Sequence, residues 1–219
     1  MLETHLPETE EFASQLNFLG SLLSLAGYKV MPYRHESLPL FCSLTPSQQK
    51  EVLKSLKAYC LALEDGVVHE ENINSTRMVW RFLVALGFFP NEELFDTVRE
   101  ETYIQIYNFD QFQIFRSVAF FDNCSFTLEE ISCRPWWQLW KRSRQDLHIL
   151  SEVSRQNLIC PQAKTLRFNH PFERAQEISD GSARQFAYRI KSATALTRSG
   201  RLHATLLVED WRTPSLLDS

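Results

Sequence analysis

Apolar side chains change their spacing near residue 100 of this 219-residue chain. Before that point they recur every three or four positions, which is typical of helices with one buried face. After it, apolar and polar residues alternate, as in strands of a half-buried sheet. The chain is therefore predicted to be α+β, with a helical domain over residues 1–100, a sheet domain over 101–212 and a tail over 213–219.

Helices account for the whole of the first domain in this prediction, which makes it a helical bundle. The first helix is expected to start near Pro7, with acidic residues in its first turn; its apolar face runs from Phe12 to Ala26, and Gly27 ends it. Thr45 and Gln48 have the spacing of a capping box around Pro46, and so predict the start of a second helix. A third is expected over about 75–86, and Asn91 begins a short fourth one.

The second domain opens with a predicted hairpin, whose strands cover residues 103–107 and 111–116. Thr127 and Glu130 form a second capping box at the start of a short helix, and a longer helix is expected from 142 to 158. Three further strands are predicted at residues 172–178, 186–196 and 202–208.

Composition excludes several classes of protein. The longest apolar run, residues 16–26, is shorter than the about 20 residues of a membrane-spanning helix. The acidic start does not match a secretory signal, so a cytoplasmic location without membrane attachment is expected. Five widely spaced cysteines and six scattered histidines predict neither disulfides nor a metal site, and no glycine-rich phosphate loop is present.

The order of elements after residue 100 resembles that of a PAS domain, and short motifs add to the likeness. Residues 123–126, followed by Thr127 to Ile131, resemble the family's G-Y-[ST]-x-E-E step. Trp136 and Leu139 resemble its W-x-x-L motif before the long helix. The Asp180-Gly181 turn and the closing strand from Ser199-Gly200 to Asp210 also resemble the family pattern.

The resemblance implies a five-stranded antiparallel sheet with flanking helices, which enclose a small cavity or form a dimer face. Its function would be sensing: a non-enzymatic regulatory protein in signal transduction that binds a small ligand or a partner protein. Since fold alone does not settle function, the ligand stays open. The partner would be a second copy, giving a homodimer, or another signalling protein.

The residues by which PAS domains bind their cofactors are matched only in part by this chain. Flavin-binding members need a reactive cysteine after the Glu-Glu step, whereas Cys124 precedes Glu129 and Cys133 follows too closely. Haem-binding members use a histidine on the long helix, which makes His148 the haem candidate; a surface histidine is the favoured alternative. The cofactor is therefore left unknown.

Two sets of side chains are the candidates for binding a ligand or a partner. The first is an aromatic group, which either plugs the core or lines a pocket: Trp136, Trp137 and Trp140. The second set consists of alternating residues of the two long strands, namely Phe186, Tyr188, Ile190, Leu206 and Val208.

Two rival functions stay open. Cations outnumber acids between residues 134 and 167, which would suit nucleic acid, although the net charge of −4 disfavours a polyanion. These cations are Arg134, Lys141, Arg142, Arg144, Arg155, Lys164 and Arg167. An enzyme at the domain joint could use His170, Glu173 or Asp210, but general acid–base catalysis needs a pair within hydrogen-bond reach.

Overall fold

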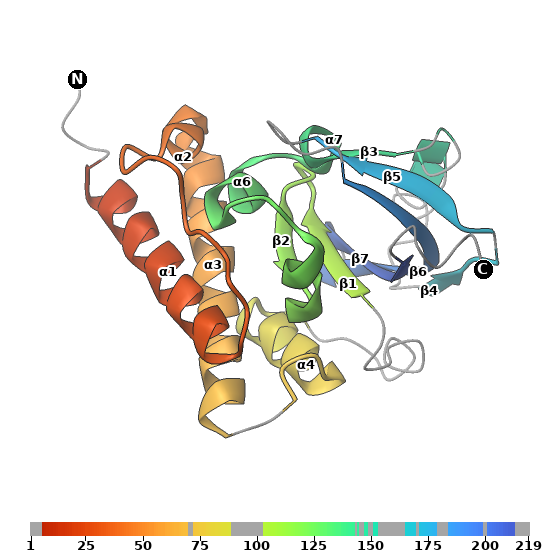
Figure 1. Cartoon of the computed structure of the whole chain (residues 1–219), viewed down its shortest axis with the longest axis horizontal. Helices are drawn as coiled ribbons and strands as arrows, with labels where there is room; N and C mark the ends of the chain where they lie inside the picture. Colours follow the sequence, from red (N-terminus) through yellow and green to blue (C-terminus); the bar gives the residue numbers. More distant parts are fainter. Residues whose placement is uncertain are drawn as a thin grey trace.

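Helices form the N-terminal part of the molecule and a curled antiparallel sheet forms the C-terminal part (Figure 1). The structure is a computed structural model, which describes the following residues: 6–69, 72–88, 103–142, 144, 147–148, 151–152, 165–169, 171–178, 184–198 and 201–212. The α+β class and the helical N-terminal region predicted from the sequence are confirmed.

The described residues before the sheet form four helices: α1 (Leu6–Leu25), α2 (Pro39–Ser43), α3 (Pro46–Val68) and α4 (Thr76–Ala85). The capping box at the start of α3 is confirmed, since Thr45 Oγ1 accepts from the Gln48 amide and Gln48 Oε1 accepts from the Thr45 amide. Gly27 and Gly87 follow α1 and α4 at φ of 91° and 77°, which favours glycine. The short α2 was not predicted, and the helix expected at Asn91 lies outside the described residues.

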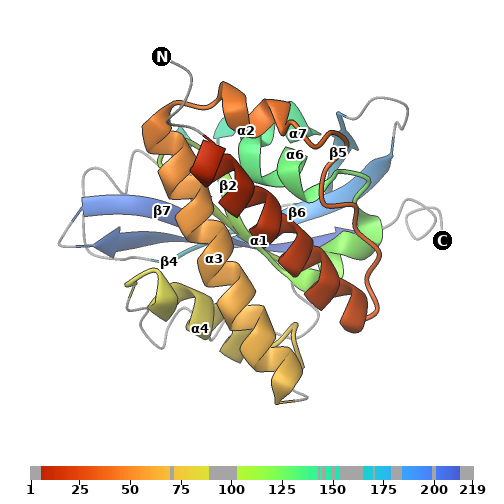
Figure 2. The ribbon, with the colours of Figure 1, turned by 90° about the vertical axis from the view of Figure 1, so that its left-hand side faces the viewer.

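Helices α1 and α3 run side by side in the same direction. Lys57 pairs with Glu11 at 2.5 Å, and one turn further along Cys60 Sγ donates to the Gln15 carbonyl at 3.6 Å. Figure 2 shows both helices in front of the sheet. A parallel pair needs a long return connection, which the segment between α1 and α3 provides.

In the part of the chain that the structure describes, seven strands form the sheet, whereas the PAS resemblance implied five. They are β1 (Tyr103–Asn108), β2 (Gln113–Arg116), β3 (Trp140–Lys141), β4 (Thr165–Arg167), β5 (Glu173–Glu177), β6 (Gln185–Arg198) and β7 (Arg201–Arg212). The order is β2-β1-β7-β6-β5-β3, and β4 pairs with β6 beyond the end of β5. Every pairing is antiparallel, so the hairpin and the three later strands predicted from the sequence are confirmed. The predicted turns at Asp180-Gly181 and Ser199-Gly200 lie outside the described residues.

Three short helical segments follow the first hairpin: η1 (Val118–Asn123), α6 (Leu128–Cys133) and α7 (Trp136–Leu139). The predicted capping box of α6 is confirmed, because Thr127 and Glu130 exchange hydrogen bonds. Within the long helix expected from 142 to 158, residues 144, 147–148 and 151–152 are helical and the remainder beyond 142 lies outside the described residues. No helix in the described ranges has both the length and the apolar character needed to span a membrane.

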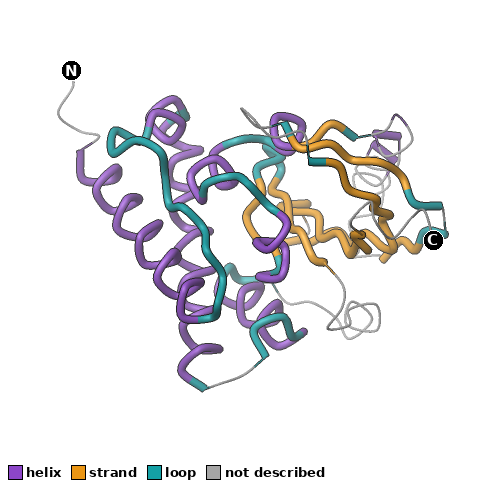
Figure 3. The backbone as a smooth tube through the Cα atoms, in the orientation of Figure 1, coloured by secondary structure: helices purple, strands orange, loops and turns teal. Residues whose placement is uncertain are grey.

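Strand register divides the sheet into two faces. Ile104 pairs with Val208 and Ile106 with both Leu206 and Phe115, so these five residues share one face, which we call the helical face. The opposite face, which we call the polar face, carries Gln105, Tyr107, Arg116, Glu209 and Trp211. Figure 3 shows the long N-terminal helices on one side of the strands.

One cluster of buried side chains runs through both parts of the chain, from Phe12 in α1 to Val208 in β7. At its centre Phe115 of β2 lies 5.1 Å from Tyr59 of α3 and 4.7 Å from Phe82 of α4, measured between ring centroids. The helices therefore share a core with the sheet. A boundary between two domains at residue 100 stays a prediction.

Phe115→Ala tests this shared core. The substitution removes a buried ring that touches both layers, and we expect it to lower the free energy of unfolding by about 3–5 kcal/mol. Phe109→Ala is the matched control, since Phe109 lies on the same hairpin and is 66% exposed; its effect should stay within about 0.5 kcal/mol. Urea unfolding, followed by far-ultraviolet circular dichroism and tryptophan fluorescence, should show one common transition. Separate transitions for helices and sheet would contradict a shared core.

Candidate functional site

A small cavity lies where the helical part meets β2. Its wall combines α1, α3, β2, η1 and α6, represented by Leu19, Tyr59, Phe115, Phe121 and Ile131. The cavity offers about 30 Å³ to the centres of water-sized molecules. That is room for roughly two waters, and far below the several hundred Å³ of pockets for drug-sized ligands. A flavin or a haem does not fit in it.

Two hydroxyl groups on this wall have partners within the protein, whereas the buried Nε of Arg116, on the same wall, makes no hydrogen bond to the described residues. The Tyr59 hydroxyl donates to the Arg116 carbonyl at 2.6 Å, and the Ser55 hydroxyl donates to the Glu51 carbonyl at 2.9 Å. Burial raises the pKa of Tyr59 well above its ordinary value, so this phenol stays protonated. Because most of the lining is apolar and the volume is small, the cavity suits a very small, largely apolar molecule.

A second arrangement, a buried hydrogen-bond network, occupies the polar face of the sheet around Glu209. One carboxylate oxygen of Glu209 accepts from Gln105 Nε2 at 2.6 Å and from Trp211 Nε1 at 2.7 Å. The other accepts from an Arg142 guanidinium nitrogen at 2.9 Å, and neither side chain of this ion pair is exposed. Since a buried charge without a partner is strongly destabilising, each of the two side chains requires the other.

The network continues from Gln105 toward the edge strand β2. Gln105 Oε1 accepts from Gln113 Nε2 at 2.7 Å and from the Tyr107 hydroxyl, while Arg116 donates to Gln113 Oε1. Burial raises the pKa of Tyr107 to about 12, against the opposing influence of Arg142. At neutral pH the phenol is therefore a hydrogen-bond donor, and not a base.

Aromatic rings pack beside this network around Trp140. Its ring lies 5.3–6.0 Å from those of Phe120, Phe126, Phe186 and Trp211, in edge-to-face geometry. Of the three predicted tryptophans, Trp136 and Trp140 are buried and Trp137 is 50% exposed. Two of the rings thus fill the interior, and the third lies on the surface.

The strand residues predicted to form one binding set are split between the two faces. Phe186, Tyr188 and Ile190 lie on the polar face, since Tyr188 pairs with Trp211 and Ile190 with Glu209. Leu206 and Val208 lie on the helical face, within the shared core. All five are buried, and neither they nor the tryptophans line the cavity, which sequence reasoning had not located.

The remaining candidates do not form a reactive centre among the described residues. His148 is exposed, and Asp210 pairs with Arg189 at 2.8 Å; His170 lies outside the description. Burial raises the pKa of Cys124, which keeps it a thiol. No group of three His, Cys, Asp or Glu able to hold a metal occurs in the ranges that the structure describes.

In the described part of the basic stretch predicted between residues 134 and 167, two of the arginines are engaged in ion pairs. Arg142 is buried against Glu209, and Arg134 pairs with Glu130 of its own helix at 3.4 Å. Lys141 and Arg144 are exposed, whereas Arg155 and Lys164 lie outside the described residues. Counting charge along the sequence overestimated this patch because a buried arginine is neutralised locally.

Searches of known protein families and of curated protein sequences find no match to this chain.

Two adjacent carboxylates of β7 allow a matched test of the buried network. Glu209→Gln leaves Arg142 buried without a countercharge, and we expect the free energy of unfolding to fall by about 3–5 kcal/mol. Asp210→Asn breaks a partly exposed ion pair and should cost less than about 1 kcal/mol. The double variant Arg142→Met and Glu209→Gln should recover much of the loss. Equal effects of the two single variants, in chemical denaturation, would show that the network does not stabilise the sheet.

Proposed function

We propose that this chain is a non-enzymatic regulatory protein, in which a PAS-like sheet domain and the N-terminal helices respond together to a small ligand or to a partner protein. The observation that carries this proposal is the position of the cavity, whose wall is built jointly by helices α1 and α3 and by strand β2. A ligand there would touch both parts of the chain at once. The signal would then pass on through protein–protein contacts.

The order of elements supports the PAS-like assignment. The hairpin β1–β2 is followed by η1, α6 and α7, and then by the antiparallel strands β5, β6 and β7 in the same sheet. The two strands beyond the expected five are short, with two residues in β3 and three in β4. They extend the sheet without changing the order of the others.

Hydrogen bonds join the N-terminal helices to the rest of the chain at several places among the described residues, which couples the two parts. Besides the Tyr59 bond to β2, the Asn74 side chain accepts from the Ala119 amide at 2.8 Å. Glu129 of α6 accepts from the amides of Leu40 and Phe41 at 2.9 and 3.3 Å, and so caps the start of α2. A shift of α6 would therefore move α2.

Population shift gives a mechanism for such a response. If the helices have two arrangements against β2, a ligand biases them only as far as it binds one more tightly than the other. The cavity meets this requirement, because any change in the distance between α3 and β2 changes its size.

The geometry favours regulation over catalysis at the joint. General acid–base catalysis needs a titratable pair facing a substrate, whereas Glu173 and Asp210 lie on β5 and β7 and do not line the cavity. The buried Arg142–Glu209 pair is enclosed and engaged in hydrogen bonds. Its geometry suits structural support of the sheet.

Filling the cavity tests the coupling. Ser55→Val adds apolar volume to the wall from α3, and we expect it to change amide hydrogen exchange both in α1 and α3 and in β1 and β7. The physical reason is that a filled cavity mimics a bound apolar ligand and favours one arrangement. Hydrogen–deuterium exchange with mass spectrometry gives the readout.

Lys54→Val is the control, since Lys54 is the preceding residue on α3 and is exposed. It should leave exchange in the sheet unchanged. If Ser55→Val alters exchange in α3 alone, the cavity does not connect the two parts, and the proposed regulatory role loses its support.

The carboxylate of Glu129 predicts a pH dependence of stability. Burial raises its pKa above the ordinary value of 4.5, which the Leu40 and Phe41 amides only partly offset. The folded state therefore binds this proton more tightly, so the free energy of unfolding falls as pH rises through the interval above 4.5. Glu129→Gln should remove this decrease while its side-chain oxygen still accepts both hydrogen bonds.

Denaturation between pH 4 and 8 measures the effect. Glu129→Ala should instead lose about 1–3 kcal/mol at every pH, because the two amides lose their acceptor. Glu51→Gln, on the exposed side of α3, should leave the pH dependence in place. A wild-type profile without this decrease, or one that Glu129→Gln does not alter, would contradict the prediction.

A further inference from the structure

Two arginines pack on Phe172 at the end of the helical face, and two further cations lie on the adjoining strands. We call this set the Phe172 cluster: Arg174, Arg189, Lys191 and Arg212, with Asp210. The guanidinium carbons of Arg189 and Arg212 lie 4.8 and 4.3 Å from the centre of the Phe172 ring. Asp210 binds Arg189 at 2.8 Å and Lys191 at 3.7 Å. Asp210 thus pairs with two of the four cations.

Strand register places these residues on a single surface. Ala187 of β6 pairs with Arg174 of β5 on one side and with Arg212 of β7 on the other. Two residues along β6, Arg189 pairs with Asp210. Asp210 and Arg212 continue the alternation of Leu206 and Val208, so the cluster extends the helical face beyond its apolar part.

Solvent reaches this surface. Arg174 and Arg212 are exposed, and the side chains of Arg189 and Lys191 are 36% and 35% exposed. Because Ala187 has the smallest side chain of the row, the arginines on either side of it can reach toward one bound group.

We propose that the Phe172 cluster binds an acidic segment of a partner protein, laid across β5, β6 and β7. This rests on the proposed function, in that a regulatory protein needs a surface for its protein contacts, and it names the chemistry of that partner. Arginine side chains bind carboxylates through two parallel hydrogen bonds, and the Phe172 ring orients Arg189 and Arg212. The cationic rows are about 10 Å apart across two strand spacings and about 7 Å apart along β6. The second distance matches alternate side chains of an extended acidic segment.

Charge within the cluster favours a peptide over nucleic acid. Asp210 lies among the cations and would repel a phosphate backbone, whereas a peptide can place a polar or cationic residue opposite it. The Phe172 ring lies under guanidinium groups and does not present a face on which a base could stack. A long polyanion would also meet a chain with a net charge of −4.

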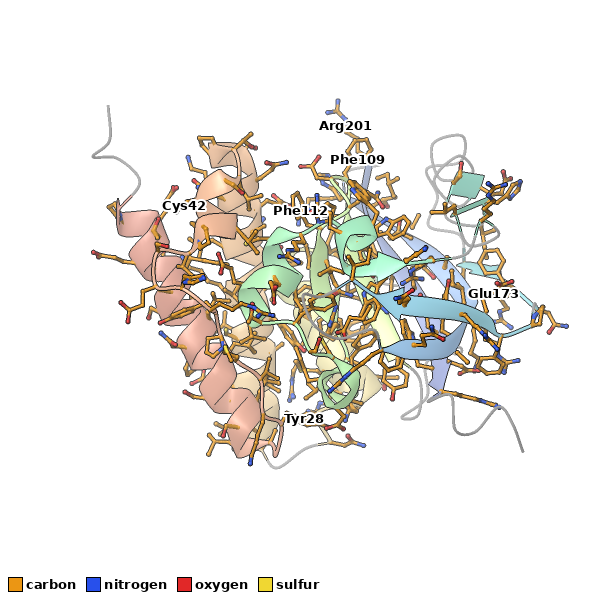
Figure 4. The ribbon with its side chains drawn as sticks, turned by 45° about the horizontal axis from the view of Figure 1, so that its top comes forward. Tyr28, Cys42, Phe109, Phe112, Glu173 and Arg201 are labelled. Atoms are coloured by element: carbon orange, nitrogen blue, oxygen red, sulfur yellow. The ribbon has the colours of Figure 1, made fainter. Side chains whose placement is uncertain are left out.

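The experiment is fluorescence anisotropy with the full-length chain and a labelled peptide of alternating glutamate and serine. Arg212→Glu should weaken binding by about tenfold, since an attraction becomes a repulsion at an exposed site. Arg201→Glu is the matched control at the other end of β7, where Figure 4 shows Arg201 far from Glu173 of β5. It should change the affinity by less than about twofold. Arg174→Glu provides a second variant on another strand, with about the same loss, in case Arg212→Glu disturbs folding as measured by circular dichroism.

Three outcomes would overturn the proposal. Arg201→Glu could weaken binding as much as Arg212→Glu, which would indicate unspecific attraction. An oligothymidine could bind more tightly than the peptide with the same dependence on Arg212, which would make the site one for nucleic acid. Sedimentation could reveal self-association that Arg212→Glu abolishes, which would make the partner a second copy. Exchange across the cavity does not involve the cluster, so failure here and failure of the proposed regulatory role are distinguishable.

Discussion

The contact between α3 and β2 is the constraint from which the rest of the structure follows. Strand β2 is the last strand of the sheet on its side, and an uncovered edge strand invites pairing with other chains. Helix α3 covers it through the Tyr59 hydroxyl and the rings of Tyr59 and Phe115. A helix cannot follow the twist of a strand over its whole length, so contact is close in places and a cavity stays between them. The packing of α3 against β2 therefore both covers the edge strand and leaves the cavity.

Strand β7 contributes side chains both to the apolar core and to the buried polar network. Its even-numbered residues Leu206 and Val208 enter the core shared with the helices, while the odd-numbered Glu209 and Trp211 enter the polar network and the aromatic cluster. Strict alternation makes this possible, because each successive side chain changes face. The last described strand therefore contributes to both layers at once.

Local signals in the sequence located most of the elements but not the site. The caps at Thr45 and Thr127 and the glycines after α1 and α4 act within a few residues, so they can be recognised in a single sequence. The face of each strand depends on register, and a bulge between Ile190 and Ser192 reverses the alternation of β6. For this reason the set predicted from Phe186 to Val208 was divided between two faces. Glu209 and Arg142 are 67 residues apart, and nothing local indicates that they pair.

Burial decides which charges of this chain stabilise the fold and which are open to partners. Neither side chain of the Arg142–Glu209 pair is exposed, so water does not weaken the attraction between them. The pair ties Arg142, which follows β3, to β7. Asp210, one residue further along β7, shows the opposite case, because its pairs with Arg189 and Lys191 remain in contact with water. Neighbouring carboxylates on one strand thus differ in role through the alternation of faces alone. Charge counted along the sequence cannot distinguish them, whereas the register of β6 and β7 does so at once.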